Sequence, residues 1–328
     1  MGVVSTSSPT FEEEDQVAER GSEGTHPNPA LKPPEVSFIV PCYRSGETVE
    51  RTLNSILEQV TSLSFEILVV ESSGDGTAES IRTRFPRVTV HALSSRTNAG
   101  TARNLGTAQA QGRYFAFLDA DVVVPPEWLE QLHSRLASSS KIRMVSAAIA
   151  NGNPTVVSRS LHWIEFSHYL FGLPSGFRPA LSSSNLLIHR RDFQTTGGFD
   201  ESMDMAEDLA LSKRLTDCLY FDGSIMLMHY FRLDWRGVRA HLESLGYWSG
   251  LYRLKFSGSG SWLRHLPLLS FGLPCFRLPK IVGRVFQSSP LQGLNAVAHL
   301  PLILAGLFSW AKGFYSGIRV QRSHEEGD

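Results

Sequence analysis

The chain has 328 residues, of which 31 are basic, 32 are acidic and 42% are hydrophobic. This length suits one large α/β domain or one domain with appendages, and the apolar content argues against a wholly disordered chain. A formal net charge of −1 argues against a protein that coats nucleic acid by bulk electrostatics. Cys42, Cys218 and Cys275 are widely spaced and form no C-x-x-C pair, so we expect neither a disulfide framework nor a cysteine-rich zinc site.

Residues 1–34 are predicted to form a disordered tail. They hold few large apolar residues, the acidic run Glu12–Asp15 and four prolines after residue 26. Such a segment cannot bury enough apolar surface to offset the entropy lost on ordering. No basic start followed by an apolar stretch is present, so the sequence gives no sign of a secretory signal.

Short apolar runs alternate with segments of helical spacing from Val36 to Leu136. Strands are expected at residues 36–40, 65–70, 88–90 and 114–118, and helices at residues 49–60, 77–85, 99–110 and 126–136. Strands that alternate with helices at this spacing predict an α/β fold with a mainly parallel sheet and helices on both faces.

Residues 141–234 have a less regular pattern. Strands are expected at 142–149 and 186–188, and an aromatic-rich helix at 159–171. Residues 172–184 are rich in Gly, Pro and Ser and are predicted to form a mobile loop.

Asp119 and Asp121 follow the fourth predicted strand in the order Asp-Ala-Asp. Ligands bind beyond the carboxyl ends of the strands in open parallel sheets, and two carboxylates one residue apart point to the same side of an extended chain. Their repulsion favours a cation such as Mg²⁺ or Mn²⁺, with a diphosphate supplying further oxygens. The alternative is a helix N-cap and a solvated carboxylate before Pro125. The spacing alone favours that alternative, whereas the position after a strand favours the metal.

Several ordered motifs resemble those of family 2 glycosyltransferases with the GT-A fold. They are Val36–Arg44 (VSFIVPCYR), Glu71–Thr77 (ESSGDGT), Asn98–Gly106 (NAGTARNLG), Asp119–Asp121 (DAD), Gly197–Glu201 (GGFDE) and Glu207–Asp208. The resemblance implies a GT-A glycosyltransferase domain, a nucleotide-diphospho-sugar transferase fold, over residues 35–234. It also implies an enzyme that transfers one sugar from a nucleotide-diphosphate sugar to a hydroxyl acceptor with inversion.

The resemblance assigns several residues to the nucleotide sugar. Pro41 and Tyr43 are expected to line the nucleoside pocket, and Glu71 stands where the family usually has an aspartate that bonds the base. That replacement, with a turn one residue shorter than usual, leaves the base preference open. Arg103 is expected to approach the nucleotide or the Asp-Ala-Asp loop, or else to pair structurally with one of the aspartates. Asn185 falls in a stretch that shapes the donor-sugar and acceptor pockets.

The resemblance also assigns the metal and the general base. Asp119 is expected near the ribose and the metal, and Asp121 is expected to ligate the metal. His229 is a further candidate for the metal or diphosphate site, with an ordinary core or surface histidine as an equal alternative. In Glu207-Asp208, Asp208 is expected to take the proton from the acceptor hydroxyl. The alternative for this pair is a favourable interaction with a helix dipole.

His162, Glu165 and His168 form a stripe at three-residue spacing on the predicted aromatic-rich helix. We interpret this stripe as structural or acceptor-facing rather than as a zinc site, because nothing else in the pattern supports a metal there.

Residues 235–328 are predicted to form amphipathic and hydrophobic C-terminal helices. Residues 235–255 interleave leucines and aromatics with basic residues, which is typical of an interfacial helix. Residues 285–311 hold no Asp, Glu, Lys or Arg, but Pro290 and Pro301 interrupt them. We therefore expect a marginal span or a re-entrant hairpin against a membrane, the alternative being soluble helices that close the catalytic cleft. Because nucleotide sugars are made in the cytosol, the cytoplasmic face of the membrane is expected, with a glycan or lipid-linked acceptor.

Three other classes of protein were weighed against this interpretation. A processive synthase would carry Q-x-x-R-W, which the sequence lacks, so we expect one sugar per encounter. A nucleotidyltransferase would carry a G-x-G-x-R loop after the first strand, where this chain has Pro41–Gly46. A degenerate, non-catalytic nucleotide-binding module is disfavoured by the retained acids Asp119, Asp121 and Asp208.

Overall fold

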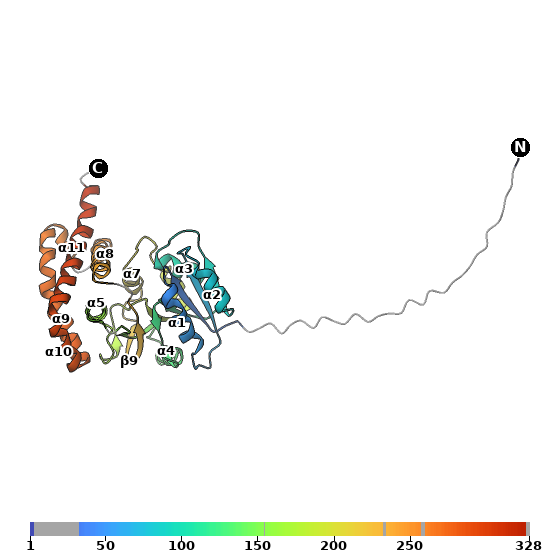
Figure 1. Cartoon of the computed structure of the whole chain (residues 1–328), viewed down its shortest axis with the longest axis horizontal. Helices are drawn as coiled ribbons and strands as arrows, with labels where there is room; N and C mark the ends of the chain where they lie inside the picture. Colours follow the sequence, from blue (N-terminus) through green and yellow to red (C-terminus); the bar gives the residue numbers. More distant parts are fainter. Residues whose placement is uncertain (3–32, 154, 232–233, 257–259, 326–328) are drawn as a thin grey trace. The chain divides into compact units, whose positions relative to one another are not determined.

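A nine-stranded sheet forms the centre of residues Pro33–Asp328 in the computed structural model of the chain (Figure 1). The structure describes residues 1–2, 33–153, 155–231, 234–256 and 260–325, with side chains as far as Val320. The predicted disordered tail, residues 1–34, lies outside the described residues except at its two ends.

The sheet is mainly parallel, as predicted, but mixed in its second half. Its strands follow the order β3 (Val88–Ala92), β2 (Phe65–Glu71), β1 (Val36–Cys42), β4 (Tyr114–Leu118), β8 (Asn185–His189), β6 (Met144–Asn151), β9 (Leu219–His229) and β5 (Val122–Val123), and β7 (Gly176–Phe177) pairs with β9. The pairs β3–β2, β2–β1, β1–β4 and β6–β9 are parallel. β8 is antiparallel to both neighbours because the chain reaches it from the carboxyl ends of the parallel strands, where Ser184 O accepts a hydrogen bond from Asp119 N.

Successive side chains of the central strands point into two different cores. Phe38 and Val40 of β1 belong to one core, and Ile39 between them belongs to the other. The first core is covered by α1 (Gly46–Leu57), α2 (Thr77–Arg84) and α4 (Trp128–Ala137). The second is covered by α3 (Ala99–Gln109), α5 (Val156–Phe166), α6 (Arg190–Thr196) and α7 (Glu207–Lys213). The prediction of helices on both faces is therefore confirmed.

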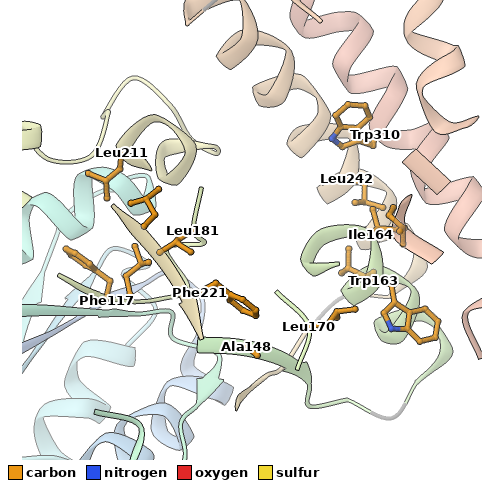
Figure 2. Close-up of a cluster of buried hydrophobic side chains, with 14 of the residues drawn as sticks. Phe117, Ala148, Trp163, Ile164, Leu170, Leu181, Leu211, Phe221, Leu242 and Trp310 are labelled. Atoms are coloured by element: carbon orange, nitrogen blue, oxygen red, sulfur yellow. The ribbon is translucent and has the colours of Figure 1, made fainter. Parts of the chain in front are cut away.

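The C-terminal part is helical and packs on the second core. It comprises α8 (Trp235–Lys255), the short 3-10 helices η1 (Ser261–Arg264) and η2 (Pro267–Gly272), α9 (Leu273–Ser288), α10 (Pro290–Ala298) and α11 (Leu300–Glu325). Figure 1 shows α9, α10 and α11 as an outer layer, with α5 and α8 between them and the sheet. In Figure 2, Ile164 of α5, Leu242 of α8 and Trp310 of α11 continue the apolar cluster outward from the strands.

Two pairs of glycines allow α8 and α11 to cross closely. Gly246 and Gly250 face α11, and Gly313 and Gly317 face α8, each pair at a spacing of four residues. A Cβ added at Gly246 would overlap the carbonyl oxygen of Trp310, and one added at Gly313 would overlap that of Glu243. The backbones therefore touch where small residues leave room, as in other helix pairs that use this spacing.

Two of the expectations for the second half of the chain need revision. The segment 172–184, expected to be a mobile loop, contains β7 and the buried Ser182, Ser183 and Ser184. The aromatic-rich helix begins and ends earlier than predicted, at Val156 and Phe166. Its start is set by Thr155, whose side chain accepts a hydrogen bond from Ser158 N.

The C-terminal apolar stretch is divided between helices. Among the described residues, no individual helix has both the length and the apolar composition needed to cross a bilayer. α10 and residues Leu300–Val320 of α11 meet those criteria only as a pair, and they are bent by 75° relative to each other.

The close crossing of α8 and α11 predicts a sharp contrast between two glycine variants. Gly313→Ala is expected to lower the free energy of unfolding by about 1–3 kcal/mol, because two packed backbones must separate. Gly283→Ala in α9 meets no atom within 4 Å and is expected to be neutral or to stabilise by up to about 1 kcal/mol. Urea denaturation of both variants measures the difference, and equal stabilities would contradict the packing.

Candidate active site

Asp119, Asp121 and His229 converge at the carboxyl edge of the sheet. Each offers one potential ligand atom, and these atoms lie within 4.8 Å of one another. His229 Nε2 is 3.6 Å from Asp121 Oδ1, and its Nδ1 is buried without a hydrogen-bond partner among the described residues. Two carboxylates and an imidazole are a donor set that suits a divalent cation. The residues predicted for the metal are thus brought together.

The strand register explains this convergence. Asp119 and Asp121 follow the end of β4, and β5 begins directly after Asp121. β5 is antiparallel to the end of β9 and pairs Val122 with His229. Tyr230 N also donates to the carbonyl oxygen of Asp121 at 2.8 Å. The last residue of β9 is therefore fixed beside the acidic loop, although it lies far away in the sequence.

Arg103 connects this acidic loop to the start of α7. Its guanidinium donates to Asp119 Oδ1 at 2.6 Å and to Glu207 Oε1 at 2.8 Å, and its side chain is only 2% exposed. Ser183 Oγ also donates to Glu207 Oε1, at 3.1 Å. Burial lowers the pKa of Arg103, but the charges of Asp119 and Glu207 outweigh this effect and raise it above its ordinary value. Of the roles expected for Arg103, the structure has the ion pair with an aspartate.

Asp208 lies next to this ion-pair network and faces the same cavity as Asp119 and Asp121. Burial, followed by the neighbouring charge of Glu207, raises the pKa of the Asp208 carboxyl to about 7. A carboxylate with a pKa near neutrality can accept a proton during a reaction and release it afterwards. Asp208, the predicted general base, thus lines the same cavity as the Asp-Ala-Asp loop.

The cavity has a volume of about 1040 Å³ and runs between the sheet edge and the C-terminal helices. Pro41 and Tyr43, the residues predicted to contact the nucleoside, line this cavity together with Ser72 and Thr97. The cavity wall also includes cationic residues of α9, namely Arg277, Lys280 and Arg284.

Two predicted nucleotide-sugar residues do not line this cavity. Glu71 is 1% exposed, and its carboxylate accepts hydrogen bonds from the backbone N and the hydroxyl of Ser73, so it shapes the loop after β2. Asn185 is fully buried, and its Oδ1 accepts from Ala147 N at 2.6 Å, which ties β8 to β6. Both side chains turn into the protein because the strands that carry them are covered on each face.

The stripe of His162, Glu165 and His168 divides among three environments. His162 is buried, and this burial lowers its pKa to about 3. Glu165 forms an ion pair at 3.2 Å with His241 in the cavity wall, and this carboxylate raises the pKa of His241 despite the opposing effect of burial. His168 lines the cavity on the side of α9.

A mixed α/β sheet with an acidic cluster beyond the carboxyl ends of its parallel strands is the architecture of a nucleotide-diphospho-sugar transferase with the GT-A fold. The mannosyltransferase PcManGT from Pyrobaculum calidifontis, solved with GDP-Man and Mn²⁺, has this fold. It matches with a TM-score of 0.54 over 90% of each chain, at 19% sequence identity. This similarity establishes the fold.

The sequence comparisons identify the family. Residues 37–196 match the model of glycosyl transferase family 2. Succinoglycan biosynthesis protein ExoO from Rhizobium meliloti (strain 1021) is 33% identical over 210 residues, which are 58% of this chain and 58% of that protein. Glycosyltransferase AglE from Haloferax volcanii is 27% identical over 192 residues, 57% of this chain and 63% of that protein. The match thus spans less than two thirds of the length of these relatives. Residues 37–196 are a glycosyl transferase family 2 domain.

Several residues of the site were not singled out from the sequence for this role. The sequence places Glu207 beside Asp208 at a helix start, but it does not indicate that Glu207 pairs with Arg103. Ser183, expected in a mobile loop, supports that anchor. The sequence does not single out the cations of α9, although their spacing of three and four residues places them on one helical face.

The ion-pair network predicts that Arg103 is essential for both stability and positioning. Arg103→Gln leaves two carboxylates without their buried cation and is expected to lower the free energy of unfolding by about 3–5 kcal/mol. Arg82→Gln removes only the exposed pair with Glu79 and is expected to cost less than about 1 kcal/mol. Chemical denaturation of both variants measures the contrast, and an Arg103→Gln variant as stable as Arg82→Gln would refute it.

Proposed function

We propose that this protein transfers one sugar from a nucleotide-diphosphate sugar to a hydroxyl of a glycan or lipid-linked acceptor, with inversion at the anomeric carbon. The observation that carries the proposal is that Asp208 faces the same cavity as Asp119, Asp121 and His229. The family membership of residues 37–196 supports the same reaction class.

The donor would extend from the nucleoside end of the cavity to the acidic cluster. Tyr43 and Pro41 would contact the nucleoside, and Asp119, Asp121 and His229 would hold a divalent cation. Mn²⁺ fits this set better than Mg²⁺, because imidazole is a poorer ligand for the harder ion. When bound, such an ion neutralises the charge that develops on the leaving diphosphate.

Asp208 would act on the acceptor. The acceptor oxygen forms a bond to the anomeric carbon while the bond from that carbon to the diphosphate oxygen breaks. The hydroxyl proton passes to the Asp208 carboxylate, and the nucleoside diphosphate leaves with the bonding electron pair. Displacement from the face opposite the leaving group needs one base and no covalent sugar–enzyme intermediate. Arg103 and Glu207 would fix the start of α7, so that Asp208 keeps its place.

The proposed base predicts the behaviour of Asp208→Asn. The variant is expected to lose about 10²–10⁴-fold in the rate of Mn²⁺-dependent release of nucleoside diphosphate, because the proton has no acceptor. The wild-type kcat/KM is expected to rise as the pH passes upward through about 7, since only ionised Asp208 accepts the proton. A panel of UDP-, GDP-, CDP- and dTDP-sugars serves for the assay.

Asp217→Asn is the matched control, because Asp217 is exposed and does not line the cavity. Thermal shift with each nucleoside diphosphate and Mn²⁺ tests whether both variants still bind the donor product. Equal turnover by Asp208→Asn and the wild type would reject the base. Nucleotide binding without turnover in the wild type would instead favour a non-catalytic binding module.

We also propose that the C-terminal helices lie against a membrane on the side that holds nucleotide sugars. η2, α9 and α10 expose large apolar side chains, namely Leu268, Leu269, Phe271, Phe276, Phe286, Leu291, Leu294 and Val297. Leu268 and Phe276 are each 71% exposed. A clustered apolar surface of this kind beside basic residues is suited to the interface of a bilayer.

The membrane proposal predicts a loss of vesicle binding when this surface is made polar. The triple variant Leu268→Ser, Phe276→Ser and Leu291→Ser is expected to bind vesicles at least about tenfold more weakly in a flotation assay, because each buried apolar side chain contributes about 1.5–3 kcal/mol. The control replaces the exposed apolar residues Val60, Leu105 and Val156 with Ser. Equal flotation of both variants would contradict the proposal.

A further inference from the structure

Helix α9 presents three different faces along its length. Pro274, Ile281 and Val285 are buried against the rest of the protein. Phe276 and Phe286 are exposed. Arg277, Lys280 and Arg284 follow one another at intervals of three and four residues, which places them on a single strip of the helix. We call this strip the cationic face of α9, and all three of its residues line the cavity.

The cationic face has no anionic partner among the described residues. None of its three side chains forms an ion pair with a carboxylate in the part of the chain that the structure describes. Arg277 Nη1 is buried and has no hydrogen-bond partner there. A buried guanidinium nitrogen without an acceptor is costly, so this group is expected to have a ligand in the working protein.

Arg277 is held in place although its nitrogen is unpartnered. Its guanidinium carbon lies 3.9 Å from the centre of the Trp310 ring, within the range of a cation–π contact. Trp310 is itself 3% exposed and belongs to the core that joins α5, α8 and α11. The cation is therefore pre-positioned, which lowers the entropy lost when an anion binds.

Further positive charge surrounds the cationic face. Burial lowers the pKa of Arg277 to about 9, with additional repulsion from Arg253 and Arg284. Burial also lowers the pKa of His168 to about 4, and the largest added effects come from Arg284 and Arg277. Several cations therefore lie close together in one wall of the cavity, and an anion with more than one negative charge would offset their mutual repulsion.

We propose that the cationic face of α9 binds the diphosphate of a lipid-linked acceptor, whose apolar chain lies over the exposed surface of η2, α9 and α10. This inference rests on the proposed glycosyl transfer and names its acceptor class. The same helix supplies both the cations and part of the apolar surface, so one amphiphile can satisfy both. The diphosphate serves as an anchor, and a sugar hydroxyl attached to it is the nucleophile.

The position of Asp208 supports an anchoring role for the diphosphate. A phosphate oxygen is already ionised near neutral pH and would need no base to attack the anomeric carbon. A sugar hydroxyl does need one, and Asp208 faces the same cavity. The donor diphosphate would be held by other elements, because the predicted metal ligands Asp119, Asp121 and His229 come from the sheet edge and not from α9.

The experiment compares three soluble probes that separate the head from the chain. Farnesyl diphosphate carries both parts, farnesol carries the chain alone, and inorganic pyrophosphate carries the head alone. Binding is measured by calorimetry with EDTA present, so that the diphosphate cannot be held through a metal at Asp119 and Asp121. We expect farnesyl diphosphate to bind at least about tenfold more tightly than either partial probe.

The variant Lys280→Gln with Arg284→Gln tests the residues, because among the described residues neither side chain forms an ion pair or a cation–π contact whose loss would weaken the fold. We expect it to weaken farnesyl diphosphate binding by about tenfold for each cation removed. The matched control is Arg87→Gln with Arg191→Gln, which removes two exposed arginines outside the cavity and is expected to bind as the wild type does. Arg277→Gln is a second test variant, and its thermal unfolding shows whether loss of the Trp310 contact affects the fold.

The outcomes separate this inference from the proposed function. Equal binding of farnesyl diphosphate by the Lys280/Arg284 variant and its control would overturn the lipid diphosphate site. Pyrophosphate binding as tight as that of farnesyl diphosphate would show an anion site without a lipid and would also overturn it. Binding of a nucleoside diphosphate with Mn²⁺ is measured in parallel. If the wild type bound none, the proposed glycosyl transfer itself would fail.

Discussion

The arrangement of the site depends on one buried cation, Arg103. Its two ion pairs join the end of β4, through Asp119, to the start of α7, through Glu207. If either carboxylate moved away, the buried guanidinium of Arg103 would lose part of its compensating negative charge. The two segments are therefore strongly coupled. In the proposed reaction, these two ion pairs would set the distance between the acidic cluster and Asp208. We therefore propose that Arg103 is a positioning residue.

The burial that raises the pKa of Asp208 also weakens the fold at neutral pH. Its pKa in the folded protein, about 7, lies above the ordinary value of 3.8. Below pH 3.8 this carboxyl group is neutral in both the folded and the unfolded protein, and its contribution to the free energy of unfolding is greatest. Between pH 3.8 and about 7 the group is ionised only in the unfolded protein, so this contribution is lost as the pH rises. At neutral pH and above, the protein retains a buried acid whose charge opposes folding. Arg103 and the hydrogen bond from Leu209 N to Asp208 partly offset this cost.

The sequence predicts local features of this protein better than long-range ones. The apolar runs of β1, β2 and β4 were identifiable because each strand is buried on both faces, and Asp119 and Asp121 were identifiable because they follow such a run. The pairing of Arg103 with Glu207 was not identifiable from the sequence, because it depends on how α3 and α7 pack together. Likewise, nothing local indicates that Glu71 turns toward Ser73 or that Asn185 bonds across to β6. Such details are decided by packing.

The outer helices are connected to the cavity through a short series of contacts. Glycines let the backbones of α8 and α11 touch at Gly246 and Gly313, and this contact fixes where α11 runs. α11 carries Trp310, which packs in the core and places its ring against Arg277 of α9. A shift in the α8–α11 crossing would therefore move a cation in the cavity wall, because Trp310 contacts both Gly246 and Arg277. The C-terminal helices are thus part of the site's geometry, because a side chain that lines the cavity takes its position from their packing.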